Sequence, residues 1–172
     1  MRNRKPTRGF TLLEVLIALL IFSLGVLGMA ALLVLSVQTN HSAYLRTQAS
    51  FLAQSMADRM RANASWALYT NLYNGTWTAP QAGATTCQTA ACGYAAVATR
   101  DIGVWTTQIA RFLPNATESI NCAGATAIPS STYPNLPPYS GLCTITLAWS
   151  ESTVVQGKTT TDTPKFVWIF QP

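Results

Sequence analysis

The sequence predicts an α+β protein in which one long N-terminal helix packs on a small antiparallel β-sheet. Three observations predict this fold class. Residues 15–37 form an uninterrupted apolar run, and an amphipathic stripe of helical spacing continues to residue 64. Two apolar segments near the C-terminus have the composition of β-strands. A chain of 172 residues has room for one modest domain besides the helix.

Charge is scarce in this chain and is concentrated at its start. Charged residues make up 10% of the sequence, whereas about 25% is usual for a soluble globular protein. Four of the eleven basic residues lie in the first nine positions: Arg2, Arg4, Lys5 and Arg8. The other seven nearly balance the six acidic residues, although the whole chain carries a net charge of +5. We therefore expect no direct nucleic-acid contact, which would need clustered basic side chains.

The apolar run predicts that residues 10–37 form a membrane-spanning helix. Between Val15 and Val37 the only polar residues are Ser23 and Ser36. At ~1.5 Å per residue, a helix of this length spans the ~30 Å hydrocarbon core of a bilayer. The run is also longer than the ~7–15 residues of a signal-peptide apolar region. Because the basic residues precede it, we expect the N-terminus inside and the remainder outside.

The helix is expected to continue beyond the membrane as an amphipathic segment over residues 38–64. No glycine or proline interrupts the chain between Gln38 and Gly75. Apolar residues recur there at helical spacing, at Leu45, Ala49, Leu52, Ala53, Met56, Met60 and Ala64. We expect the domain of residues 65–172 to dock on this stripe.

A second, short helix is expected within that domain. Thr99 or Asp101 is placed to cap a helix over residues 102–112, and Pro114 is placed to end it. Three apolar side chains would share one face of this helix: Trp105, Ile109 and Phe112.

The strands are expected in the C-terminal third of the chain. Residues 143–149 alternate as a strand does, with one face formed by Cys143, Ile145, Leu147 and Trp149. A second strand is expected around residues 154–155, and residues 165–170 are apolar enough for a central strand. A loop over residues 157–164 would join these two as a hairpin. Residues 74–80 are expected to form a loop.

All four cysteines lie in the domain: Cys87, Cys92, Cys122 and Cys143. This placement agrees with an oxidising periplasm. Of the three connectivities, we favour 87–92 with 122–143, because each closes a local loop. The second would tie the ends of a segment, residues 128–141, that holds four prolines. No metal site is expected, since the only histidine, His41, is at the membrane edge and Cys-x4-Cys lacks a second close pair.

Residues 9–14 place a glycine, an aromatic residue, a small hydroxyl residue and an acid ahead of the apolar run: Gly9-Phe10-Thr11-Leu12-Leu13-Glu14. With the basic leader, residues 1–9, this motif resembles the prepilin signature of type IV pilins and type II secretion pseudopilins. The resemblance implies a type IV pilin-like fold. It implies cleavage between Gly9 and Phe10 by the prepilin peptidase and N-methylation of Phe10 by the same enzyme. It also implies that Glu14 pairs with the new amine of a neighbouring subunit and sets the register of assembly.

The later sequence resembles the PilV-type minor pilins. The resemblance rests on Asp101 and Trp105, on Phe112-Leu113-Pro114-Asn115, and on the strand over residues 144–149. It implies a minor pilin that resides in the inner membrane before assembly and in the pilus fibre or tip afterwards. The implied partners are the prepilin peptidase, other minor pilins and the major pilin. The resemblance does not decide whether a tip adhesin is also a partner. Such subunits serve pilus assembly, cell adhesion and twitching motility.

Two alternatives stay open. One is a minor pseudopilin of type II secretion, which has a similar leader. The other is a membrane-anchored or secreted periplasmic binding protein, in which the apolar run is a plain anchor or a signal peptide cut after Ala30. Enzymatic activity is not expected, because the sequence has no Gly-x-Ser-x-Gly motif, no P-loop and no second histidine. We accordingly expect no catalytic residue and no cofactor.

Overall fold

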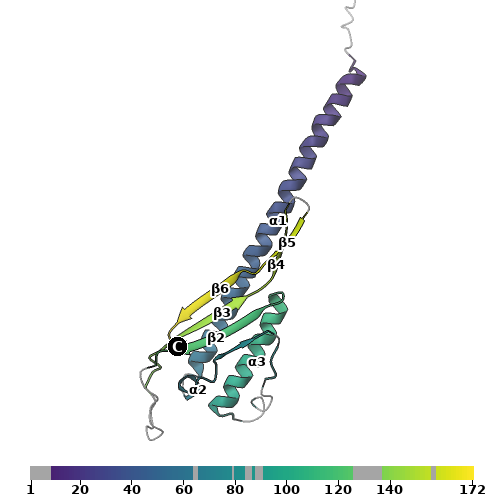
Figure 1. Ribbon diagram of the computed structural model, residues 1–172. Helices are drawn as coiled ribbons and strands as arrows, with labels where there is room; N and C mark the ends of the chain where they lie inside the picture. Colours follow the sequence, from purple (N-terminus) through teal and green to yellow (C-terminus); the bar gives the residue numbers. More distant parts are fainter. Residues whose placement is uncertain are drawn as a thin grey trace, which may run out of the picture. The chain divides into compact units, whose positions relative to one another are not determined.

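The computed structural model describes residues 9–63, 66–78, 80–83, 87, 91–125, 137–155 and 158–172. The chain divides into two compact units, Met1–His41 and Ser42–Pro172. Helix α1, Leu12–Ala62, passes through both (Figure 1). The other elements are α2 (Trp66–Tyr69), β1 (Gly75–Trp77), α3 (Tyr94–Phe112), β2 (Thr117–Ala123), β3 (Leu142–Ala148), β4 (Glu151–Val155), β5 (Lys158–Asp162) and β6 (Lys165–Phe170). The α+β class with a long N-terminal helix is confirmed.

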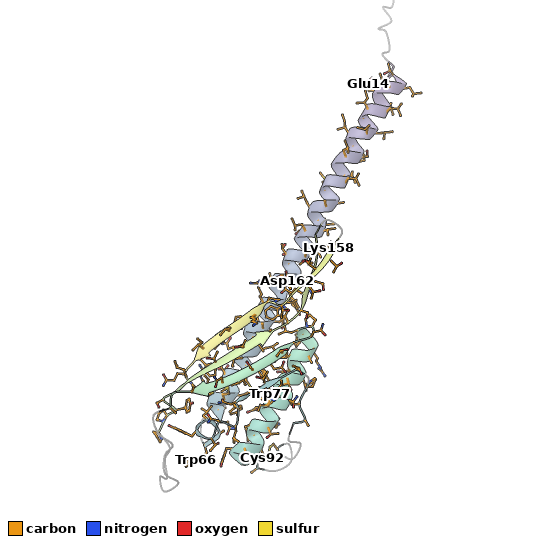
Figure 2. All side chains as sticks on the ribbon, in the orientation of Figure 1. Glu14, Trp66, Trp77, Cys92, Lys158 and Asp162 are labelled. Carbon is orange, nitrogen blue, oxygen red and sulfur yellow. A yellow bond between two sulfur atoms is a disulfide. The ribbon has the colours of Figure 1, made fainter. Side chains whose placement is uncertain are left out.

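The first unit consists of the apolar part of α1. None of its described residues is buried, and large apolar side chains from Phe10 to Val37 are 48% to 85% exposed. Figure 2 shows these side chains projecting from all sides of the helix. By length and composition alone, α1 can cross a membrane. A helix that is apolar all round needs lipid or other helices around it.

The second unit has one hydrophobic core, to which α1 contributes the predicted stripe. The buried residues of α1 are Leu45, Ala49, Leu52, Ala53, Met56, Ala57 and Met60. The stripe is thus confirmed to Met60; Ala64 lies outside the described residues. The same core holds Trp105 and Ile109 of α3 and the inner face of the sheet. The Trp105 indole N–H donates a hydrogen bond to the Leu52 carbonyl oxygen of α1 at 3.0 Å.

The main sheet has four antiparallel strands in the order β1-β2-β3-β6. Strand β3 confirms the predicted strand and its inner face, because Cys143, Ile145, Leu147 and Trp149 are all buried. Strands β4 and β5 form a separate two-stranded sheet (Figure 1). Its register continues that of β3 and β6, with Ala148 opposite Lys165 and Glu151 opposite Asp162. The segment from β3 to β6 is therefore one interrupted hairpin.

Helix α3 is longer than the predicted short helix, because it begins at Tyr94. Gly93 is its N-cap and offers no side chain for capping, so the sequence carries no cap signal there. Thr99 and Asp101 lie inside the helix and do not cap it. The end before Pro114 is as predicted. Of the predicted face, Trp105 and Ile109 are buried. Phe112 is 43% exposed, because the next residue, Leu113, takes the buried position.

The predicted arrangement of the strands is wrong in three respects. Strand β6 lies at the edge of the sheet and not at its centre, with Val167 and Ile169 54% and 64% exposed. The segment expected to be a loop over residues 157–164 contains β5, and Gly157 lies outside the described residues. Strands β1 and β2 were not predicted, and β1 lies within the expected loop at residues 74–80.

Candidate functional site

The start of α1 is fixed by Thr11. The Glu14 backbone N–H donates to Thr11 Oγ1 at 3.2 Å, and the Val15 N–H donates to the Thr11 carbonyl oxygen at 3.3 Å. Thr11-x-x-Glu14 has the spacing of a capping box, in which the cap side chain satisfies a backbone donor that the helix leaves unpaired. The cap therefore keeps Gly9 and Phe10 outside the helix.

The Gly9–Phe10 peptide bond lies in exposed, non-helical backbone. Phe10 is 85% exposed, and a Cβ placed on Gly9 would meet no atom within 4 Å. Exposed segments of this kind are the preferred sites of proteolysis. A peptidase can reach this bond without unwinding α1. The basic residues 1–8 lie outside the described part of the chain.

Glu14 is exposed in the first turn of α1 (Figure 2). The positive end of the helix dipole stabilises a carboxylate there by about 0.3–1 kcal/mol. Neither of the two ion pairs among the described residues involves Glu14. One shallow hollow on this side of the helix is bordered by Phe10, Glu14, Val15, Ala18, Leu19 and Phe22. Once such an apolar surface is covered, the carboxylate needs a cationic partner.

Residues 4–30 match the prokaryotic N-terminal methylation motif. The match includes the Gly9–Phe10 bond, Glu14 and residues 15–30 of the apolar run. It supports a type IV pilin-like or pseudopilin-like protein, with processing by the prepilin peptidase and components of a pilus or pseudopilus as partners. The motif and the apolar helix fit a single-pass membrane anchor. No curated protein and no solved structure matches the chain.

The four cysteines form two disulfides, both in the second unit. Cys87 pairs with Cys92, and Cys122 pairs with Cys143. The second bond joins β2 to β3 at directly opposed positions of the ladder. It therefore joins the end of β2 to the start of β3, the two ends of the long connection between these strands. This is the connectivity that the local-loop argument favours.

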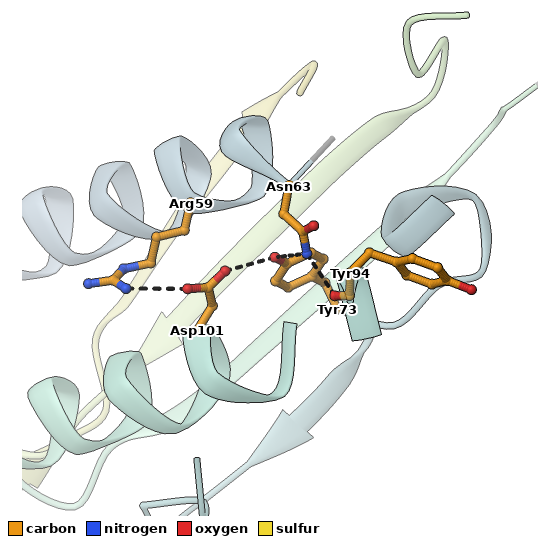
Figure 3. Close-up of polar contacts among 5 residues, drawn as sticks. All are labelled: Arg59, Asn63, Tyr73, Tyr94 and Asp101. Carbon is orange, nitrogen blue, oxygen red and sulfur yellow. Dashed lines mark hydrogen bonds and ion pairs between the residues drawn. The ribbon is translucent and has the colours of Figure 1, made fainter. Parts of the chain in front are cut away.

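A polar network ties the end of α1 to α3 (Figure 3). Arg59 Nη1 lies 3.4 Å from Asp101 Oδ1, and the Tyr73 hydroxyl donates to Asp101 Oδ2 at 2.9 Å. The Asn63 side-chain amide donates to the Tyr73 hydroxyl and to the Tyr94 carbonyl oxygen, both at 2.9 Å. The network therefore joins α1, the chain before β1 and the first turn of α3.

Electrostatics in this network favour the neutral phenol. Burial raises the pKa of Tyr73 well above its usual range; the hydrogen bond from Asn63 opposes that rise, and the Asp101 carboxylate adds to it. Arg59 Nε is buried and has no hydrogen-bond partner in the described residues. The arrangement joins α1 to α3 through side-chain hydrogen bonds and one ion pair. We assign it a structural role.

Sequence reasoning missed this network and the buried Glu118. No motif in the sequence marks Arg59 or Asn63 for these contacts, and the contacts of Tyr73 and Asp101 bridge residues far apart in sequence. Glu118 was hidden in a strand that was not predicted. No group of three or more potential metal ligands occurs among the residues that the structure describes.

Proposed function

We propose that this protein is a minor pilin, a structural subunit of a type IV pilus. The observation that carries the proposal is the methylation motif over residues 4–30, joined to a capped helix whose first part, to Val37, is apolar and exposed. A disulfide-bonded domain on that helix suits a subunit that faces the periplasm and then the cell exterior. The proposed work of the chain is assembly and not catalysis.

In this proposal the prepilin peptidase cleaves between Gly9 and Phe10 and methylates the new amine. A methylated amine keeps its positive charge at neutral pH. In a fibre, the apolar helices of adjacent subunits surround one another and exclude water. The Phe10 ammonium of one subunit then neutralises Glu14 of the next, because an unpaired buried charge is costly and a paired one much less so. The pair specifies the register at which a subunit is added.

Processing is tested by intact mass and N-terminal sequencing of the protein from membranes, with and without the prepilin peptidase. We expect a chain that starts at Phe10, carries one additional methyl group and depends on the peptidase. A chain starting at Met1 or Ala31 regardless of the peptidase would contradict the proposal. That result would favour a plain membrane anchor or a secreted binding protein.

A type II secretion minor pseudopilin would pass the same mass test, because the motif is common to both. Deletion of the gene separates the two functions. We expect fewer or shorter pili and intact protein secretion. Unchanged pili with impaired secretion would assign the protein to the secretion system.

A further inference from the structure

Glu118 is an acidic residue at a core position. The residue is 2% exposed. It occupies the first inward-facing position of β2, before Ile120 and Cys122. The strand register places it between Trp77 of β1 and Leu147 of β3, and neither of these neighbours can carry charge. A carboxylate in such surroundings is costly unless a cation accompanies it.

No described basic residue provides that cation. The two ion pairs of the described residues are Arg59–Asp101 and Arg61–Asp58. Every lysine and arginine of residues 9–172 is described. Burial raises the pKa of the Glu118 carboxyl to about 7, against a hydrogen bond from its own backbone N–H. Near neutral pH the protonated and ionised forms of the carboxyl are therefore both populated. A nearby cation would favour the ionised form.

Glu118 lines a small hollow between α3 and β2. The hollow has a volume of about 110 Å³. Thr106, Ile109 and Leu113 are buried in its lining, whereas Thr78 and Asn115 are exposed. The site therefore has a buried acidic end and a rim open to solvent. No other titratable side chain lines it, from α3, from β2 or from the segments beside them.

The lining favours an ammonium group over a metal ion. A metal ion would need several strong ligands, but Glu118 is the only His, Cys, Asp or Glu side chain there. At the buried end, an ammonium group can donate to the carboxylate oxygens of Glu118. The apolar walls suit the methylenes of an aliphatic stem. A water needs roughly 10–15 Å³ of such volume, so a head group and part of its stem can enter.

We propose that this hollow binds a primary ammonium group on an aliphatic stem, as presented by a lysine side chain of a partner protein. The proposal does not depend on the assignment to pili. It predicts that binding strengthens as Glu118 ionises, because only the carboxylate pairs with the cation.

The test is a carboxyl ¹³C NMR titration of the full chain in detergent, with glutamate labelled at Cδ. The chain has three glutamates, Glu14, Glu118 and Glu151, and Glu118→Gln assigns the relevant signal. n-Butylammonium chloride at ten times its dissociation constant should lower the apparent pKa of Glu118 by about one unit, by linkage. The carboxyl signal of Glu151 should not respond to butylammonium.

Tetramethylammonium chloride is the matched control, since it has the charge but no N–H donor. We expect it to leave the Glu118 titration unchanged. The proposal is overturned if butylammonium has no effect, if tetramethylammonium has an equal effect, or if Glu118 titrates near its ordinary value without any amine. If Glu118→Gln does not fold, Glu14→Gln and Glu151→Gln assign the other two signals and leave the third to Glu118, so the wild-type titration still decides these outcomes.

Zero-length carbodiimide coupling in native membranes separates the two sources of the amine. Coupling joins the Glu118 carboxyl to a lysine amine as an amide, and the carbodiimide takes up the released water as a urea. A Glu118–lysine link to another chain, found by mass spectrometry, would support a protein contact. A butylammonium effect without any such link would overturn the lysine assignment and leave a site for small amines.

Discussion

Glu14 and Glu118 are both carboxylates in apolar surroundings, but their positions give them different consequences. Glu14 is exposed at the start of a helix whose apolar side chains are also exposed, whereas Glu118 is buried within the folded domain. Under the proposed function, Glu14 therefore matters when subunits meet, whereas Glu118 matters whenever the domain is folded.

Glu14→Gln should block incorporation into the fibre while leaving processing intact. The amide cannot neutralise the neighbouring ammonium, and leaving one charge of a buried pair unmatched costs ~3–5 kcal/mol. We expect at least a roughly tenfold drop in the sheared pilus fraction. Immunoblots of sheared and membrane fractions measure it, with Ser23→Ala as a matched control in the same helix. Normal incorporation of the Gln variant would show that Glu14 does not specify the register of assembly.

Asp101→Asn should destabilise the second unit by about 1–3 kcal/mol, because it weakens bonds to both Arg59 and Tyr73. Asp58→Asn is the matched control. It breaks an exposed ion pair with Arg61 one helical turn away, and such pairs contribute ~0–1 kcal/mol. Urea unfolding followed by near-ultraviolet circular dichroism compares them. Equal effects would mean that the network in Figure 3 is no stronger than a surface contact.

Glu118 should make the domain less stable as pH rises. Its folded-state pKa of about 7 exceeds the usual 4.5, so between these values the folded state binds more protons than the unfolded state. The stability contributed by the protonated carboxyl is full below about pH 4.5 and is lost by about pH 7. The loss is roughly 2–3 kcal/mol. Urea midpoints measured across this range should fall for wild type more than for Glu118→Gln. Parallel curves would show that Glu118 titrates normally.

At the scale of the element, the two disulfides should stabilise the domain by different amounts. The Cys122–Cys143 bond closes a loop with a sequence separation of 21, and the Cys87–Cys92 bond one of 5. In the chain-entropy model a longer loop gives more stabilisation, here by about 1 kcal/mol. Thermal unfolding of the two double alanine variants tests this order. A larger loss on removing Cys87–Cys92 would show that local order around α3 outweighs loop entropy.

The elements also show how far sequence pattern predicts structure. The stripe on α1 and the alternation in β3 are unbroken, and both were predicted. Strand β2 was not, because Glu118 occupies its first inward position and breaks the alternation that marks a strand. The start of α3 was missed because Gly93 gives no cap signal and only Ala98 is buried before Asp101. The apolar composition of β6 suggested a central strand, but composition cannot specify which strands flank it.

At the candidate site, the sequence was more informative than in the domain. In the proposed function, Gly9, Phe10 and Glu14 act through local order along the chain, so a short motif contains them. The contacts of Tyr73, Asp101 and Glu118 depend on segments that meet only after folding. No spacing in the sequence indicates those contacts.

At the scale of the whole molecule, the core lies entirely in the second unit, from Leu45 to Phe170. We therefore expect a fragment that begins at Ser42 to fold and stay monomeric without detergent, with both disulfides formed. Size-exclusion chromatography and near-ultraviolet circular dichroism test this. A molten or aggregated fragment would show that the first unit is needed for folding.

The hydrogen bond from the Trp105 indole N–H to the Leu52 carbonyl oxygen makes one proton a reporter of how often the domain opens. The bond spans from α3 to the middle of α1, and Trp105 is fully buried. Its single indole proton can exchange with deuterium only when the two helices part. The rate of that exchange, read from one resonance, would report how often the domain opens. Followed in free and assembled protein, it would show whether joining a polymer slows the opening of a domain whose core lies outside the apolar part of α1.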